Sequence, residues 1–351
     1  MSALAPGARV SDYDYALDPS RIARYPTERR DASRLLVVPR AGGDLRHGVF
    51  TDLVDLVQPD DLLVVNESRV LKARLRGHKP SGAPAEVLLL QPRAVGSEVL
   101  WEALVRPGGK LKPGRTVVVA DDLTVDIVDS TADGGRLVRL RTPLPLEQAL
   151  ERHGRLPLPP YLEREAEDSD LERYQTVYAR VAGSVAAPTA GLHFTETLLA
   201  ELAERGVETA PVVLHVGPGT FRPVEGDDPA AHPMHTERWS IPPATADALA
   251  RCRARGGRVW AVGTTVTRTL ESAAGPDGRV QAGEGETRLF IRPPYPFRVV
   301  DALITNFHLP RSTLLMLVAA LAGYERIMDA YAEAVRSGYR FYSYGDAMAI
   351  V

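Results

Sequence analysis

Residues 183–199, GSVAAPTAGLHFTETLL, are the part of this sequence whose residue types and spacing most clearly indicate chemistry. Small residues and one proline run into an amphipathic helical pattern. The polar side chains among the first thirteen positions are Ser184, Thr189, His193 and Thr195. Such a loop brings backbone N–H groups close to a ligand, and the helix after it has a positive end. We expect Ser184, Thr189 and Gly191 to bind substrate, with His193 as a proton carrier. A tight turn in a packed core is the alternative.

Two further turns rich in glycine and hydroxyl residues follow, at 215–222 (HVGPGTFR) and 263–265 (GTT). Each comes directly after a predicted strand, and strand ends in open α/β sheets are where ligands bind. The glycine spacing is neither a dinucleotide fingerprint nor a Walker phosphate loop. We therefore expect a pocket for a polar metabolite that involves Gly217, Gly219, Thr220, Arg222, Thr264 and Thr265. Ordinary strand-end turns and a routine helix start are the alternatives.

Other titratable side chains are less specific. Asp301 and His308 flank another predicted strand, and each taken alone is more often structural than catalytic. His232 and His235 form an H-x-x-H pattern in a loop, where His215 or Glu237 would have to complete a zinc site. Because the helical H-E-x-x-H arrangement is missing, we expect no metal here.

The elements that must position these residues change character along the chain. Short β-rich runs separated by glycine and proline turns occupy residues 61–141 and predict a small antiparallel barrel, with its domain at 61–149. From about residue 190, strands and helices alternate, which predicts a largely parallel sheet with covering helices. We therefore expect a multi-domain α/β protein. Residues 1–60 and 150–351 would form a discontinuous α/β catalytic domain with the barrel inserted between them.

Basic residues concentrate in the predicted barrel. Residues 61–141 carry thirteen Lys and Arg against ten Asp and Glu, although the whole chain has a net charge of -3. Near the chain end, aromatic residues surround an arginine and a carboxylate, an arrangement that can stack on a base. A solvated strand face and core packing are the alternatives. The candidate nucleic-acid contacts are Arg69, Lys72, Arg74, Arg76, Lys110, Lys112, Arg340, Tyr344 and Asp346.

The composition is that of a globular protein: 351 residues, 44% hydrophobic and 25% charged. The single cysteine, Cys252, excludes an intrachain disulfide and a cysteine-built metal site. The first ten residues lack the pattern of a signal peptide, and the longest apolar run, 314–322, is too short to cross a bilayer. We therefore expect a cytoplasmic protein without membrane contact.

Long, ordered motifs along nearly the whole chain resemble those of the S-adenosylmethionine:tRNA ribosyltransferase-isomerases of queuosine biosynthesis. The matching segments are 25–26, 30–37 (RDASRLLV), 66–70 (NESRV), 73–75, 154–161 (GRLPLPPY), 172–179 (ERYQTVYA), 184–195, 214–224, 234–237 (MHTE), 262–265 (VGTT), 304–310 (ITNFHLP) and 340–348.

This resemblance implies transfer and isomerisation of the ribosyl group of S-adenosylmethionine onto 7-aminomethyl-7-deazaguanine at the tRNA wobble position. The products would be epoxyqueuosine, adenine and methionine. Because the sulfonium substrate carries the reactivity, no metal or redox cofactor is expected. The partners would be S-adenosylmethionine and the anticodon arm of tRNA, and we expect a monomer.

The resemblance also suggests roles. His193 is the first candidate for proton transfer, followed by His215 and His308, and Asp301 and Asp346 are candidate acceptors. Arg222 would pair with the substrate carboxylate. Two other classes stay open: a non-catalytic RNA-binding protein, and a metal-dependent hydrolase that uses His232 and His235.

Overall fold

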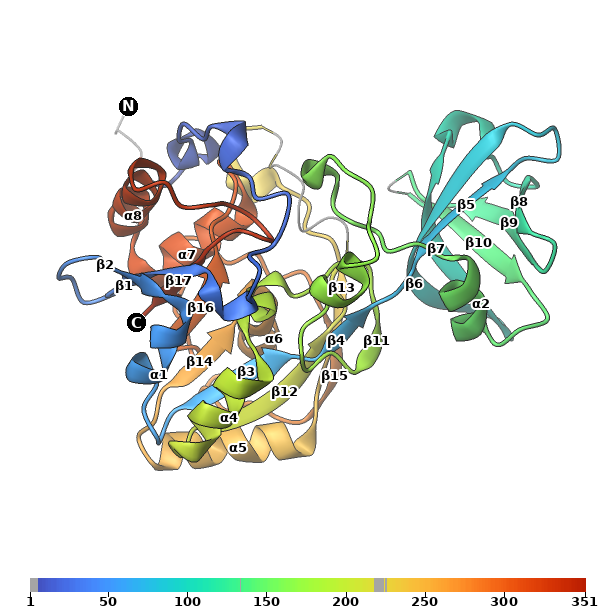
Figure 1. Cartoon of the computed structure of the whole chain (residues 1–351). Helices are drawn as coiled ribbons and strands as arrows, with labels where there is room; N and C mark the ends of the chain where they lie inside the picture. The colour runs from blue at the N-terminus through green and yellow to red at the C-terminus, as the bar shows by residue number, and fades with distance from the viewer. Residues whose placement is uncertain (1–5, 133, 218–223, 225) are drawn as a thin grey trace.

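The computed structural model describes residues 6–132, 134–217, 224 and 226–351, which form an α/β domain and a β-barrel (Figure 1). The α/β domain is built on a nine-stranded mixed sheet, and the barrel is closed, antiparallel and six-stranded. The predicted fold class is therefore confirmed. Only the centre of the sheet is purely parallel.

Four parallel strands form the centre of the sheet, in the order β12, β3, β14, β16. Beyond β16, β17 is antiparallel to it and parallel to β1. Antiparallel β13, β15 and β2 complete the two edges. The bounds are β1 Arg34–Val38, β2 Arg46–Val49, β3 Leu62–Asn66, β12 Glu208–Leu214, β13 Glu237–Ile241, β14 Val259–Val262, β15 Gly283–Thr287, β16 Ala302–Asn306 and β17 Ala347–Ile350.

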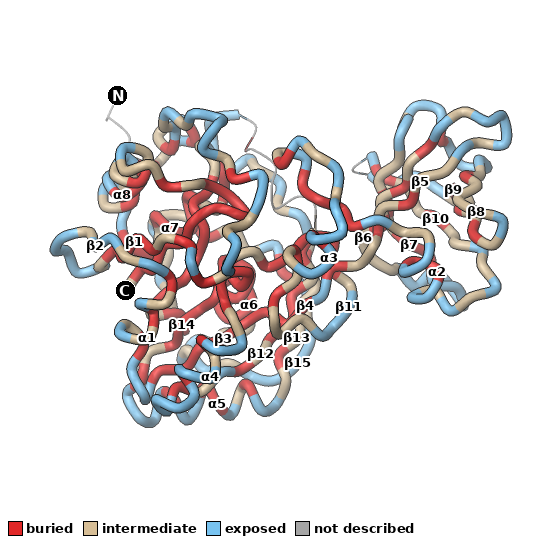
Figure 2. The backbone as a smooth tube through the Cα atoms, viewed as in Figure 1, coloured by how far each residue is buried: buried red, intermediate tan, exposed pale blue. Residues whose placement is uncertain are grey.

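Helices cover both faces of this sheet, so its central strands are buried on both sides (Figure 2). In β3, Leu62 and Val64 belong to the core beneath α5–α8, whereas Leu63 and Val65 belong to the core beneath α1 and α4. Burial on both faces explains why these strands are continuous apolar runs. The helix bounds are α1 Leu53–Leu56, α4 Glu196–Glu204, α5 Pro243–Ala254, α6 Thr264–Ala273, α7 Thr313–Ala322 and α8 Tyr324–Arg336.

Capping explains where several helices begin. Thr195 Oγ1 accepts a hydrogen bond from the Leu198 N–H at 3.1 Å, which starts α4. Ser312 does the same for α7 through the Leu315 N–H at 3.2 Å. Gly323, at φ 94°, separates α7 from α8.

The barrel has the strand order β10-β7-β6-β5-β8-β9 and an alternating burial pattern typical of a closed sheet. Helix α2 packs Ala149 and Leu150 into the barrel core. The bounds are β5 Arg74–His78, β6 Pro84–Val95, β7 Glu98–Arg106, β8 Thr116–Ala120, β9 Leu123–Ser130, β10 Arg136–Arg141 and α2 Leu146–His153.

The barrel begins later than residue 61, where the sequence interpretation placed its boundary. Strand β3, which was assigned to the barrel, is a central strand of the large sheet. Strand β4 (Ser68–Val70) pairs in parallel with β11 (Val181–Ser184) outside the barrel. The sequence carried a warning: β3 reads LLVVN, an unbroken apolar run, whereas a small barrel has alternating strands.

Polar contacts join the two domains beside the connecting segments. The backbone groups of Arg74 and Arg155 exchange hydrogen bonds at 2.9 and 3.1 Å. Lys72 forms an ion pair with Glu151 at 2.8 Å, and Arg76 forms one with Glu165 at 2.6 Å. In the described parts of the chain, no helix is long and apolar enough to cross a membrane.

Candidate functional site

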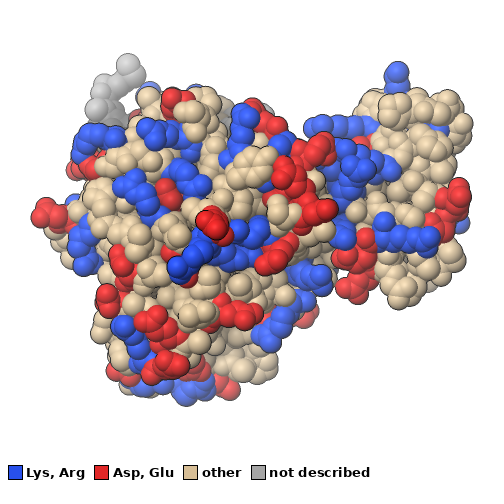
Figure 3. Space-filling view, viewed as in Figure 1, with Lys and Arg blue, Asp and Glu red and all other residues tan. Residues whose placement is uncertain are grey.

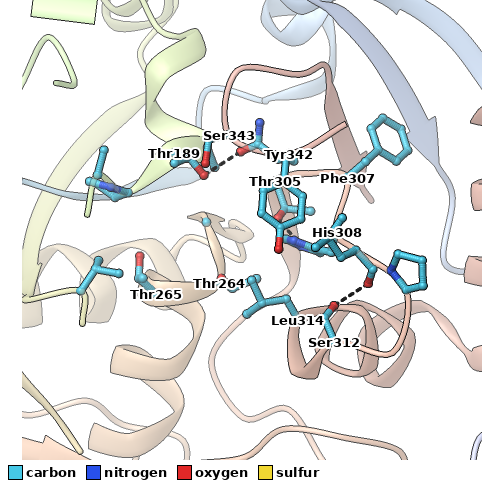
Figure 4. A pocket seen from close by; sticks show the side chains of 18 residues that line it. Thr189, Thr264, Thr265, Thr305, Phe307, His308, Ser312, Leu314, Tyr342 and Ser343 are labelled. Carbon is cyan, nitrogen blue, oxygen red and sulfur yellow. Dashed lines mark hydrogen bonds between the residues drawn. The ribbon is translucent and has the colours of Figure 1, made fainter. Parts of the chain in front are cut away.

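A cavity of about 690 Å³, counting its open mouth, lies at the carboxyl ends of β14 and β16. This is the edge at which open α/β sheets bind ligands. Thr189 and Ser343 lie at the top of the cavity as viewed in Figure 4, Thr264 and Thr265 at its left, and His308 at its right. Segments distant in sequence therefore supply one hydroxyl-rich pocket. Its lining is Ala187, Pro188, Thr189, Ala190, Val216, Gly263, Thr264, Thr265, Thr305, Asn306, Phe307, His308, Leu309, Pro310, Ser312, Leu314, Tyr342 and Ser343.

The N-terminus of α6 opens into this cavity. Gly263 takes φ 93°, a conformation that L side chains rarely adopt, and this lets β14 turn directly into the helix. Thr264 and Thr265 follow as the first helical residues, and both line the cavity. Unpaired N–H groups and the helix dipole make this end favourable for negative charge and for ribose oxygens.

His308 is the histidine that the structure places in the cavity. Its Nε2 lies 3.0 Å from Thr305 Oγ1, and its main-chain N–H donates to the Tyr331 hydroxyl at 2.9 Å. Its carbonyl accepts a hydrogen bond from the Tyr15 hydroxyl. Burial lowers the pKa of His308 to about 3. The imidazole is therefore neutral at physiological pH and firmly positioned, and the same burial makes it a weaker base than a free imidazole.

His193, the first candidate from the sequence, lies behind the cavity wall. Its Nδ1 is 2.7 Å from Ser33 Oγ and its Nε2 is 3.0 Å from Asn306 Nδ2. Asn306 in turn accepts a hydrogen bond from Thr189 at 3.1 Å, and both of these residues line the cavity. Burial, with smaller contributions from Arg340 and Arg30, lowers the pKa of His193 to about 3. Both ring nitrogens are engaged, and His193 does not line this cavity but a smaller neighbouring hollow, which shares Ser343 with it.

The structure does not bring His215 or Asp301 into the cavity lining. Asp301 precedes β16 at the opposite edge of the sheet, where it accepts a hydrogen bond from the Val259 N–H and forms an ion pair with Arg253, both at 2.7 Å. His215 packs against Gly183, whose Cβ, if present, would lie 2.5 Å from the imidazole Cε1. Burial and Arg238 lower the pKa of His215.

The predicted substrate-binding residues divide into three groups. Thr189, Thr264 and Thr265 line the cavity. Ser184, Gly191 and Gly217 support the surrounding loops: the Ser184 hydroxyl bonds to Ser68 at 2.9 Å, and a Cβ on Gly191 would lie 2.1 Å from the Tyr178 hydroxyl oxygen. The Gly217 N–H donates to Glu237 at 3.3 Å. Gly219, Thr220 and Arg222 lie outside the described residues.

The predicted tRNA contacts are similarly divided. Arg69, Lys110 and Lys112 are exposed, whereas Lys72 and Arg76 are ion-paired at the domain junction. Arg74 donates to the Leu158 carbonyl at 3.3 Å, and Arg340 to the Tyr25 carbonyl at 3.3 Å. Basic and acidic side chains alternate where the barrel meets the α/β domain (Figure 3).

Tyr344 and Asp346 are buried, so they are not available to stack on a base or to bind its edge. The Tyr344 hydroxyl donates to Asp170 at 2.7 Å, and Asp346 accepts hydrogen bonds from the main-chain N–H groups of Arg34 and Arg340 at 3.0 and 2.8 Å. Both are 3% exposed. The aromatic sequence at the chain end is therefore explained by core packing, the alternative stated above.

Sequence reasoning missed Asn306, Thr305 and Ser343 as cavity residues. The available signal was their position: Thr305 and Asn306 end a buried strand, and polar residues there face the ligand edge of the sheet. His232 and His235 line a separate, smaller cavity. Within the described ranges, no group of three or more His, Cys, Asp or Glu is arranged to hold a metal.

The two buried histidines predict that the protein loses stability in acid. Their pKa values of about 3 in the folded state lie below the usual 6.5, so the unfolded chain takes up protons first. Their contribution is complete above pH 6.5 and is lost as the pH falls toward 3. Between pH 7 and 5 each should reduce the free energy of unfolding by about 2 kcal/mol. Urea unfolding should therefore show a pH 7 to 5 difference about 2 kcal/mol smaller for His308→Gln than for the unsubstituted protein. An unchanged difference would contradict a neutral, buried His308.

The family model for the queuosine biosynthesis protein matches residues 10–350. The S-adenosylmethionine:tRNA ribosyltransferase-isomerase of Anaeromyxobacter sp. (strain Fw109-5) is 53% identical over 97% of this chain and 99% of that protein. The protein of the same name from Symbiobacterium thermophilum is 53% identical over 98% of this chain and 100% of that one. A crystal structure of S-adenosylmethionine tRNA ribosyltransferase from Thermotoga maritima, 39% identical, covers 97% of this chain and 99% of its own, with a TM-score of 0.55. This chain therefore belongs to the queuosine biosynthesis protein family, that of the S-adenosylmethionine:tRNA ribosyltransferase-isomerases.

Proposed function

We propose that this protein transfers and isomerises the ribosyl group of S-adenosylmethionine onto 7-aminomethyl-7-deazaguanine at the wobble position of tRNA. The products are epoxyqueuosine in tRNA, adenine and methionine. The observation that carries this proposal is the 53% identity, over nearly the whole chain, to relatives named for that activity. The residue types that line the cavity at the sheet edge support the proposal, because they match the groups that this chemistry requires.

The first requirement is a base against the 5′ carbon of the ribose. The adjacent sulfonium makes this carbon a weak acid, so a neutral imidazole in a dry site can take its proton. His308 is that base in our proposal, because it lines the cavity and is held in place through Thr305 and Tyr331. The proton that it accepts is then available for the departing adenine.

The second requirement is stabilisation of the oxygens of the opening ribose. Preorganised donors aimed at developing negative charge stabilise a transition state more than flexible ones. Thr264, Thr265 and the N-terminus of α6 provide such donors on one side of the cavity, and Thr189 and Ser343 on the other. His193 then acts as a positioning residue that fixes Asn306.

The third requirement is a surface for the anticodon arm. We assign this to the barrel, with the exposed Lys110 and Lys112 as phosphate contacts. Lys112→Glu is expected to raise the KM for tRNA several-fold and to reduce the slope of log affinity against log salt by about 1. Arg279→Glu, a charge reversal at an exposed site of the α/β domain, is the matched control and should change neither. Equal changes in the KM for tRNA and in the salt slope for both variants would indicate that tRNA does not bind at Lys112.

The direct test is incubation with S-adenosylmethionine and tRNA that carries the precursor base, followed by chromatography of free adenine. The proposal requires adenine release that depends on both substrates. Binding of tRNA without adenine release would favour the non-catalytic RNA-binding alternative, and activity abolished by a chelator would favour the metal-dependent one. The cytoplasmic location and the monomeric state stay predictions from the sequence.

A further inference from the structure

A second cavity, of about 450 Å³ with its mouth, adjoins the first. Leu314, near the start of α7, lines both, so the two cavities meet at this side chain. Arg268 and Glu237 are the charged residues of the second cavity, and neither has a role in the chemistry above. Both are almost fully buried, at 5% and 4% exposure. Buried charges in a cavity wall require an explanation.

Arg268 has an unused donor. Its Nε donates to the Leu289 carbonyl at 3.0 Å, and its Nη1 is paired with Glu237. Its Nη2 is buried and has no hydrogen-bond partner among the residues that the structure describes. A buried charged N–H without an acceptor is strongly unfavourable, so this donor requires an acceptor from beyond the described residues, such as a ligand in the cavity. The ion pair with Glu237 fixes the plane of the guanidinium in advance.

Helix α6 connects this donor to the first cavity. Thr264 and Arg268 are four residues apart, and residues at this spacing lie on the same face of a helix, one turn from each other. Thr264 lines the first cavity and Arg268 the second. A ligand with a nucleoside in the first cavity and a short chain that passes Leu314 would therefore bring the end of that chain to Arg268.

We propose that Arg268 binds the α-carboxylate at the amino-acid end of the sulfonium substrate, in this second cavity. The inference rests on the proposed function, whose substrate is a nucleoside joined to an amino acid. A guanidinium edge matches a carboxylate in shape and charge. A tRNA phosphate is disfavoured, because a nucleic-acid backbone cannot reach a side chain that is 6% exposed. The assignment differs from the sequence expectation, which gave the carboxylate to Arg222.

The test compares two ligands that differ at the amino-acid end, S-adenosylhomocysteine and 5′-methylthioadenosine, by calorimetry without tRNA. Arg268→Met should weaken S-adenosylhomocysteine about 10- to 100-fold and leave methylthioadenosine within about 3-fold. Arg268→Lys, which keeps the charge but loses the planar fork, should fall between. Arg279→Met, at an exposed site of the α/β domain, is the matched control and should change neither affinity. Arg222→Met tests the rival carboxylate site from the sequence and should not discriminate between the ligands. Discrimination by Arg222→Met alone, or equal weakening of both ligands by Arg268→Met, would overturn the proposal.

A titration with a decarboxylated ligand and a parallel assay of adenine release test the inference even if the variant does not fold. If Arg268→Met does not fold, the unsubstituted protein is titrated with S-adenosylhomocysteine and with its decarboxylated analogue. The analogue should bind about 10- to 100-fold more weakly, and equal affinities would refute a carboxylate site. Adenine release with precursor-bearing tRNA is measured in parallel. A protein that releases adenine without an Arg268 effect refutes this inference alone, whereas ligand discrimination by Arg268 without adenine release refutes the proposed function alone.

Discussion

His308→Gln is expected to lower the kcat of adenine release by about 100- to 10,000-fold, the range over which general bases contribute. Glutamine keeps a polar side chain of similar reach but cannot take a proton from the 5′ carbon. Because the cavity walls are unchanged, the KM for S-adenosylmethionine should stay within a few-fold. Steady-state assays of adenine release measure both constants.

His47→Gln is the matched control for that variant. His47 lies on β2, where its Nδ1 is 2.9 Å from the Tyr339 hydroxyl, and it lines none of the cavities described above. The kcat of the His47→Gln variant should equal that of the unsubstituted protein. His193→Gln should reduce kcat less than His308→Gln does, because His193 acts through Asn306. A His308→Gln enzyme with full turnover, or a larger loss of kcat for His193→Gln than for His308→Gln, would indicate that His193 in the loop at 183–195 is the base.

Asp61→Ala is expected to reduce the free energy of unfolding by about 3 kcal/mol. The carboxylate of Asp61 is 2% exposed and accepts hydrogen bonds from the Trp260 indole at 2.8 Å and from Arg258 Nη2 at 2.7 Å. Burial raises the pKa of Asp61, but hydrogen bonds from Arg258, Gln58 and Trp260 outweigh burial and hold the pKa below its usual range. Removing the carboxylate leaves the buried indole N–H of Trp260 in β14 without its acceptor. Urea unfolding followed by tryptophan fluorescence measures the loss of stability.

Asp60→Ala, at the exposed neighbouring position, is the control and should change stability by less than about 0.5 kcal/mol. Asp61 precedes β3 at the edge of the sheet opposite the cavity. At temperatures where the variant stays folded, the kcat of Asp61→Ala should therefore equal that of the unsubstituted protein. A stable Asp61→Ala protein with reduced kcat would mean that this edge takes part in the chemistry.

Local patterns were sufficient to predict much of this fold. The alternating strands of the barrel, the caps at Thr195 and Ser312, and the division at Gly323 are all encoded within a few neighbouring residues. The boundary of the barrel, in contrast, is not encoded in any local pattern. Strand β3 pairs with β12 and β14, which are far away in the sequence, and no local pattern specifies which sheet a strand joins.

The site shows the same division between local and long-range information. That the turn at 263–265 lies at the ligand edge of the sheet could be predicted, because a strand leads directly into a helix. The choice between His193 and His308 could not be predicted from the sequence, because it depends on which imidazole faces the cavity. Asn306 covers His193, and Asn306 comes from a strand more than a hundred residues later. Tyr344 and Asp346 illustrate the converse case: an aromatic, charged segment resembled a surface for bases, but its polar atoms bond to distant backbone and side-chain groups.

The central claim is that the sulfonium nucleoside lies in the cavity at the carboxyl ends of β14 and β16. A crystal structure of this protein with S-adenosylhomocysteine tests it most directly. We expect the ribose between Thr264 and Thr189, with its 5′ carbon facing His308 and the ligand carboxylate at Arg268. A complex in which the nucleoside occupies another part of the protein, with this cavity empty, would contradict the account.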